Sequence, residues 1–160
     1  MPVILTDASL KISKTADTTG LVELACVASH MELAPDTAVT TVDTFCGSFD
    51  YPGSTKWSLI ATLVQSFDTD ATEEVLSAAV ALGAPVPFEL SAYKAPISAQ
   101  NPGWIGKVQP APYAPLNGDA GEASTVELEW AVVEGPTKIT TPPAGTMMAA
   151  ASSSSSETPA

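Results

Sequence analysis

The amino-acid sequence predicts a mainly β fold: an antiparallel β-sandwich or partly closed barrel with one flanking α-helix. The clearest observation is the stretch Ser124–Val133, where apolar side chains alternate with polar ones, as in a strand with one buried face. The apolar spacing becomes helical only over residues 71–82. Elsewhere, β-branched and aromatic stretches are separated by turn-forming Gly, Pro and Asn, which indicates about seven strands in all.

The chain begins with residues 1–19, which we interpret as an N-terminal arm or one weak strand. Its apolar pieces, Val3–Leu5 and Leu10–Ile12, are too short to indicate more. The stretch Leu21–Ala28 alternates and predicts the first clear strand of the domain. Residues 29–37 have the composition of a loop.

Two strands are predicted next, over Val39–Cys46 and Lys56–Gln65, because both are rich in β-branched or alternating apolar residues. Between them, Asp50-Tyr51-Pro52-Gly53 is typical of a type II turn, with Pro and Gly at its central positions. Three apolar residues of the second strand are expected in the core, namely Trp57, Leu59 and Leu63.

The helix is predicted over residues 71–82. Asp70 is a good N-cap residue, and Glu73 three positions later completes a capping-box pattern. Apolar residues follow at helical spacing, and Gly83 with Pro85 ends the pattern.

The second half of the chain continues with strands over Val86–Tyr93, Trp104–Val108, Ser124–Val133 and Lys138–Thr140. The segment 94–122 around the second of these is rich in Pro, Gly and Asn. Four apolar residues of these strands are expected in the core: Phe88, Val126, Leu128 and Trp130. The folded domain therefore spans 20–143, and the Ala/Ser-rich segment 144–160 is expected to be a flexible tail.

The charge of the chain is strongly acidic. It has 18 Asp and Glu against 6 Lys and Arg, a formal net charge of −12, and no Arg is present. Nucleic-acid binding requires clustered cations to contact phosphates, and docking on anionic membranes requires basic patches. No secretory signal and no apolar run long enough to span a membrane is visible. We therefore expect a protein made in a cytosol that has no membrane partner.

The two cysteines, Cys26 and Cys46, are not predicted to pair. In a hairpin of the first two strands they are offset by about six residues, or roughly 20 Å at the usual rise per residue. A disulfide requires Cα atoms within about 7 Å. We expect both residues to be buried free thiols.

Catalytic and metal-binding patterns are weak. The single histidine, His30, lies in a predicted loop and has no nucleophile motif beside it. One His and two dispersed Cys do not form a metal cluster. Asp68, Asp70 and the acidic residues after them lack the calcium-loop pattern, so helix capping explains them better. No cofactor is expected.

Glu127 and Glu129 lie on one face of a predicted strand. Parallel neighbours on a strand do not suit the opposed carboxylates of a glycosidase. A solvated acidic face is the simpler interpretation, and an acidic wall is the sharper one. Of the three tryptophans, Trp57 and Trp130 lie on apolar strand faces, which leaves only Trp104 as an exposed candidate for stacking on sugars.

The layout of strand, Cys-Gly turn, Trp strand, helix, Gly-rich loop and final strand resembles the major tail proteins, or tail tube proteins, of long non-contractile-tailed phages. The resemblance covers about 20–143 and includes no single specific motif. It is carried by these stretches: Val22–Val27, Thr44–Gly47, Gly53–Leu59, Phe67–Asp68 with the helix that follows, Val86–Phe88, Gly106–Val108, Asn117–Gly121 and Thr125–Trp130.

This resemblance implies a structural protein of the virion tail that is assembled in the host cytoplasm and is not an enzyme. Such proteins form stacked rings, usually hexameric, around a channel through which DNA passes without specific binding. It also implies partners among the tape measure, tail terminator and distal tail proteins. Glu127 and Glu129 are candidates to face the channel. The segments 1–19, 29–37 and 94–122 are candidates for contacts between subunits.

Two other functions stay open at this point. An acidic binding module for a host-surface sugar or protein would use Trp104, Tyr93 and Tyr113 as its platform. Another structural role in the virion belongs to the same alternative. An enzyme is the second alternative, and it would need a cleft with a perturbed acid pair, which no sequence feature indicates.

Overall fold

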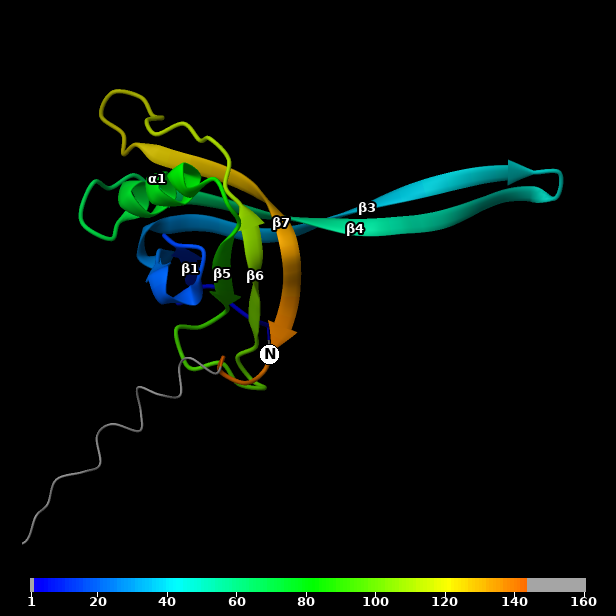
Figure 1. Ribbon diagram of the computed structural model, residues 1–160, viewed down its shortest axis with the longest axis horizontal. Coiled ribbons are helices and arrows are strands. Elements are labelled where there is room, and N and C mark those ends of the chain that lie inside the picture. The colour runs from blue at the N-terminus through cyan, green and yellow to red at the C-terminus, as the bar shows by residue number, and fades with distance from the viewer. Residues whose placement is uncertain (1, 144–160) are drawn as a thin grey trace, which may run out of the picture.

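The computed structural model in Figure 1 describes residues 2–143 of the 160-residue chain. In this part of the chain, seven strands form one antiparallel sheet in the order β2-β1-β5-β6-β7-β4-β3, and one α-helix packs against it. The sheet is not closed, since β2 and β3 end it. The predicted mainly β fold with one helix is confirmed. The elements are β1 (Ser9–Ser13), β2 (Leu21–Glu23), β3 (Ala28–Thr44), β4 (Gly47–Val64), α1 (Thr72–Leu82), β5 (Val86–Ser91), β6 (Gly103–Gln109) and β7 (Thr125–Ile139).

Strand β7 divides the sheet into two layers. Its first part, Thr125–Val132, pairs with β4, and its second part, from Ala131 to Ile139, pairs with β6. Figure 1 shows β7 curving from one layer to the other. A strand that changes layers through a bend or bulge is how sandwiches make their corners. We call β3, β4 and the first part of β7 layer A, and β2, β1, β5, β6 and the second part of β7 layer B.

The paired strands β6 and β7 approach each other closely at Gly106. A Cβ atom at this position would lie 2.3 Å from the carbonyl oxygen of Glu134, which no side chain can tolerate. The register between the two strands shifts on both sides of Lys107. Glycine at 106 therefore allows β6 to lie close to the irregular part of β7 within layer B.

The hydrophobic core lies between the two layers and the helix. From α1, the side chains of Val75, Leu76 and Ala79 are fully buried in it. Trp57 is only half-buried, because it lies at the last residue pair between β4 and β7. The other six residues expected in the core are at most 3% exposed: Leu59, Leu63, Phe88, Val126, Leu128 and Trp130.

The helix occupies the predicted range, but its N-terminus differs from the prediction. The N-cap is Ala71, which makes no side-chain capping bond, and Asp70 has a left-handed backbone with φ of 56°. The Asp70 N–H donates to Oε2 of Glu74 at 2.8 Å, so Glu74 rather than Glu73 provides the capping carboxylate. Gly83 ends the helix in the left-handed conformation, with φ of 67°.

The N-terminal segment contains a full strand of the sheet. Strand β1 pairs with β2 on one side and β5 on the other, and its Leu10 and Ile12 are completely buried. The predicted strand over Leu21–Ala28 is wrong as one unit. It breaks after Glu23 into a short 3-10 helix, Ala25–Val27, before β3 begins. The break is needed because β2 belongs to layer B and β3 to layer A.

The predicted loop 29–37 and the predicted turn at Asp50–Gly53 are also wrong. Strands β3 and β4 form one long hairpin whose turn lies at Phe45 and Cys46. Both Pro35 and Pro52 fit within it, because each lies on a strand that has an unpaired edge at that point. The prolines therefore predicted a break in each strand, but an unpaired strand edge tolerates proline without a break.

The two cysteines are free, but the prediction that they are buried is wrong. Both side chains are exposed. Cys46 lies in the turn of the long hairpin, and Cys26 lies in the 3-10 helix between β2 and β3. Burial was expected because free cysteine usually behaves as a small hydrophobic residue, but a hairpin turn and a short connecting helix on the surface leave both thiols exposed.

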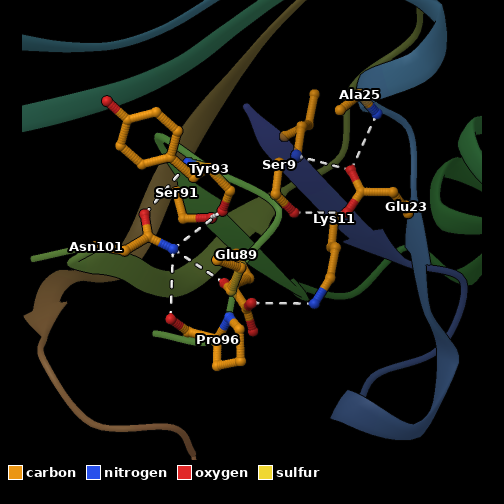
Figure 2. Close-up of polar contacts among 11 residues, drawn as sticks. Ser9, Lys11, Glu23, Ala25, Glu89, Ser91, Tyr93, Pro96 and Asn101 are labelled. Carbon is orange, nitrogen blue, oxygen red and sulfur yellow. Dashed lines mark hydrogen bonds and ion pairs between the residues drawn. The ribbon is translucent and has the colours of Figure 1, made fainter. Parts of the chain in front are cut away.

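A polar network fixes layer B and the segment that follows β5 (Figure 2). The buried side chain of Asn101 accepts a hydrogen bond from the Tyr93 N–H at 3.2 Å. It donates to the carbonyls of Tyr93 at 3.0 Å and Ala95 at 2.9 Å. The Glu23 carboxylate accepts from the Ser9 hydroxyl at 2.5 Å. The Asn101 bonds satisfy backbone groups of Tyr93 and Ala95 and hold the 94–102 segment in place after β5, while the Ser9–Glu23 bond joins β1 to β2.

Candidate functional site

The solvent side of layer A carries a row of carboxylates across three strands. In the strand register, Glu32 lies opposite Ile60, and Ile60 lies opposite Glu129. Since directly opposed residues share a face, these side chains project from the same side of the sheet. The next row is His30, Thr62 and Glu127 in the same order. We call this surface the acidic face: His30, Glu32, Ile60, Thr62, Glu127 and Glu129.

The acidic face has no lysine in these two rows. His30 is its one ionisable base, and its Nε2 lies 3.6 Å from Oε2 of Glu32. The predicted pair, Glu127 and Glu129, is exposed on this face. Glu32 was missed because 29–37 was interpreted as a loop. The alternation of Met31 and Leu33 with His30 and Glu32 was the available signal.

The acidic residues near the start of α1 are engaged in structural contacts. Lys14 forms ion pairs with Asp70 and, at 3.2 Å, with Glu74. The Tyr113 hydroxyl donates to Glu73 at 3.1 Å, and burial with this carboxylate nearby raises the pKa of Tyr113 above its usual value. Within residues 2–143, no group of three or more His, Cys, Asp or Glu side chains is placed to hold a metal ion. These carboxylates therefore join the β1–β2 connection and the 110–124 segment to the helix.

The aromatic residues of the alternative binding platform are not free to stack on a ligand as a group. Trp104 and Tyr113 are partly buried and pack against the core. Tyr93 is 37% exposed, and both its backbone polar groups are bonded to Asn101. The geometry gives no support to a sugar-binding platform built from these three rings.

The most prominent feature is the outer part of the β3–β4 hairpin, which we call the hairpin arm: residues 35–44 and 47–56 with their turn. Figure 1 shows it extending away from the body. In the arm, β3 and β4 pair only with each other, because β7 pairs with β4 only from Trp57 onward. Every arm residue is exposed. Five large hydrophobic residues of the arm are exposed to solvent: Val39, Val42, Phe45, Phe49 and Tyr51.

The two faces of the hairpin arm differ in character. Val42 lies opposite Phe49 and Thr40 lies opposite Tyr51, so one face is largely aromatic and apolar. The opposite face is more polar. There the Thr41 hydroxyl donates to Asp50 at 2.7 Å, and Ser48 donates to Asp43. An exposed apolar stripe on an isolated hairpin is typical of a surface that binds another protein.

Layer A also has two unpaired edges. Strand β3 ends the sheet on one side. On the other side, β6 begins to pair with β7 only at Ala131, so Val126–Trp130 has β4 on one side and no strand on the other. Open strand edges of this kind can accept further strands. No helix within residues 2–143 has both the length and the apolar character needed to cross a membrane.

Comparisons with known proteins identify the fold but no family. No protein-family model matches the chain, and no curated protein matches it. Among solved structures, the chain is similar to one from the virion of the native gene transfer agent particle, with a TM-score of 0.57 and 14% sequence identity. The match covers 83% of this chain and 95% of the other. At this identity the match shows that the two chains share a fold.

Proposed function

We propose that this chain is a structural protein of a virion that assembles with copies of itself into the tail tube, as stacked hexameric rings around a channel. The observation that carries the proposal is the long hairpin arm, whose apolar face has no partner within the described chain. A monomer gains little from such an arm, since a two-stranded hairpin alone is marginally stable in water. The fold shared with a virion chain supports the same conclusion.

The open edges of layer A suggest how a ring closes. The β3 edge of one copy can pair with the Val126–Trp130 edge of the next, and repetition of this contact continues layer A around an axis. Contacts between unlike surfaces generate rings when the rotation closes. The result is a continuous barrel with one face of every layer A directed inward.

We assign the acidic face to the inside of that barrel. A lining of lysine and arginine would bind DNA phosphates by releasing counterions, and each added contact would strengthen retention. Exposed carboxylates instead repel the phosphates, so that DNA can slide through without binding. Glu127, Glu129 and Glu32 supply this lining, and the proposed channel binds no particular DNA sequence.

The test replaces the proposed lining charges in the particle from which the protein comes. Glu127→Lys with Glu129→Lys should leave tubes intact in electron micrographs and slow or stall DNA ejection. The control, Asp68→Lys, reverses an exposed charge outside the proposed channel and outside the candidate contact segments, and it should eject normally. Normal ejection by the first variant contradicts the channel assignment. A chain that stays monomeric, both alone and in its particle, contradicts the tail-tube proposal.

A further inference from the structure

An apolar hollow of about 460 Å³ opens on layer B. Its walls come from the segment before β2, from β5 and β6, and from the second part of β7. This volume is within the range of pockets that accept an organic side chain or small ligand. We call the hollow the socket, and the lining residues used below are Leu21, Pro87, Ile105, Lys107, Glu134 and Thr137.

The tip of the hairpin arm is the most exposed apolar group of the described chain. Phe45 has a relative exposure of 112%, so its ring touches almost nothing in its own molecule. The tip is ordered by hydrogen bonds: the Thr44 hydroxyl donates to the Gly47 carbonyl at 2.8 Å and accepts from the Cys46 N–H at 3.3 Å. An aromatic ring held on an ordered turn loses little conformational freedom on docking.

The tip cannot enter the socket of its own molecule. The arm is paired along its length and extends away from the body (Figure 1). The socket is lined by residues of layer B, which belongs to the body. We propose that the tip of one copy docks in the socket of a second copy, with the Phe45 ring as the group that enters it. This inference rests on the proposed function, because it names the contact through which copies join.

The charge distribution favours this partner surface over the rest of the molecule. Residues 9–23, 86–109 and 131–139, which form layer B and its connections, contain five of the six lysines and four acidic residues. Their net charge is therefore +1. The rest of the chain carries −13, which gives the total of −12. The arm itself has three Asp and one Lys, a net charge of −2.

An acidic arm is repelled by layer A of another copy but not by layer B. The charges at the socket wall are balanced, since Lys107 forms an ion pair with Glu134 at 3.5 Å and Glu89 forms one with Lys11 at 3.1 Å. The socket can therefore accept the apolar tip without the repulsion that the acidic face of layer A would exert on the arm.

The docking contact joins two different surfaces, the tip and the socket. A bound pair therefore still presents one free tip and one free socket, and the contact repeats from copy to copy. This is a second contact, separate from the edge-to-edge pairing of layer A. It can link neighbouring subunits in one ring or in adjacent rings.

The native Cys46 beside Phe45 provides a direct test. In a Cys26→Ser background, Thr137→Cys places a thiol at the socket, and mild oxidation of assembled tubes should give a disulfide-linked ladder on a non-reducing gel. The bond requires Cα atoms within about 7 Å. Ser77→Cys, on the exposed side of α1, is the matched control and should give no ladder.

A second experiment uses substitutions that remove the Phe45 ring or fill the socket. Phe45→Ala should raise the protein concentration needed for assembly by about 10- to 100-fold, the effect of losing one buried aromatic side chain. Thr137→Trp fills the socket and should have a similar effect. Combining the two should add little, since both remove the same contact. Circular dichroism of each monomer checks that the fold is retained.

The outcomes separate this inference from the proposed function. Tubes that form normally with Phe45→Ala, or that give no ladder with Thr137→Cys, overturn the docking contact and leave the tail-tube proposal intact. Wild-type protein that never associates overturns both. A ladder with Thr137→Cys, none with Ser77→Cys, and impaired assembly with Phe45→Ala support the docking contact.

Discussion

Strand β4 runs through two different environments in one molecule. From Trp57 to Val64 it lies between β3 and β7, and its Leu59, Ala61 and Leu63 are buried. From Gly47 to Lys56 it pairs with β3 alone, and no residue is buried. Backbone pairing is therefore continuous, but hydrophobic burial stops where β7 ends its contact. The comparison shows that the body is stabilised by its own core, whereas the apolar side chains of the arm stay exposed in the monomer and can be buried only against another molecule.

The comparison is tested most strongly by removing the arm. Replacing residues 37–55 with Asn-Gly joins the opposed pair Asp36 and Lys56 through a two-residue hairpin turn. The body should fold with its free energy of unfolding unchanged within about 1 kcal/mol, since the removed segment buries no side chain. Assembly should be lost completely, as measured by electron microscopy and sedimentation. Tubes formed by the shortened chain would contradict the role of the arm.

A pair of single substitutions tests the same contrast at the level of side chains. Trp130 in layer A is 1% exposed, and its indole N–H donates to the Ala111 carbonyl at 3.1 Å. Trp130→Ala should lower the free energy of unfolding of the monomer by about 3–5 kcal/mol. Tyr51→Ala in the arm should lower it by only about 0.5 kcal/mol or less. Urea unfolding of both monomers measures the difference, and equal losses would mean that the arm is stabilised within its own molecule.

The smallest expected effect concerns the charge contacts that join α1 to the body. The Asp70 N–H and the Lys14 ammonium group lower the pKa of Glu74. Because the folded-state pKa is below the unfolded value, this carboxylate stabilises the fold above its unfolded pKa, and the stabilisation is lost as pH falls through the folded pKa. Glu74→Gln should therefore reduce stability slightly at neutral pH and flatten its decline in acid.

Unfolding midpoints between about pH 7 and about pH 3 measure this dependence. Glu122→Gln, a change in an exposed loop, is the matched control and should follow the wild-type profile. If the unfolding midpoint of the Glu74→Gln protein falls with pH as steeply as that of the wild type, the Glu74 contacts do not contribute to the pH dependence of stability. Glu74→Gln should not affect assembly, because this residue lies outside the arm, the socket and the open edges of layer A.

Local patterns predicted the elements that depend on local chemistry. The alternation of Val126, Leu128 and Trp130 identified the first part of β7 and its buried face, since a strand side chain reports its face every second residue. The helix was predictable for the same reason, because Val75, Leu76 and Ala79 recur at helical spacing and Gly83 stops it. Glu127 and Glu129 were predicted to share a face, and they do.

The hairpin arm was not predictable from such patterns. Pro35 and the Pro52-Gly53 pair read as breaks, because turn propensity carries no information on whether a strand has an open edge. Glu32 joined Glu127 and Glu129 only through the register of three strands. The socket combines residues from four separate segments, and no local signal connects Leu21 with Ile105 or Thr137.

The sequence by itself determined the mainly β composition, the single helix, the acidic charge and the inward faces of the core strands, because each follows from residue type and short-range spacing. The tertiary structure alone decided that β7 belongs to both layers, that β4 enters the body only at Trp57, and that five of the six lysines lie in layer B and its connections while carboxylates gather on layer A. These features depend on contacts between residues far apart in the chain. A periodicity of two or of 3.6 residues shows only which face of an element a side chain occupies, not which distant segment it contacts.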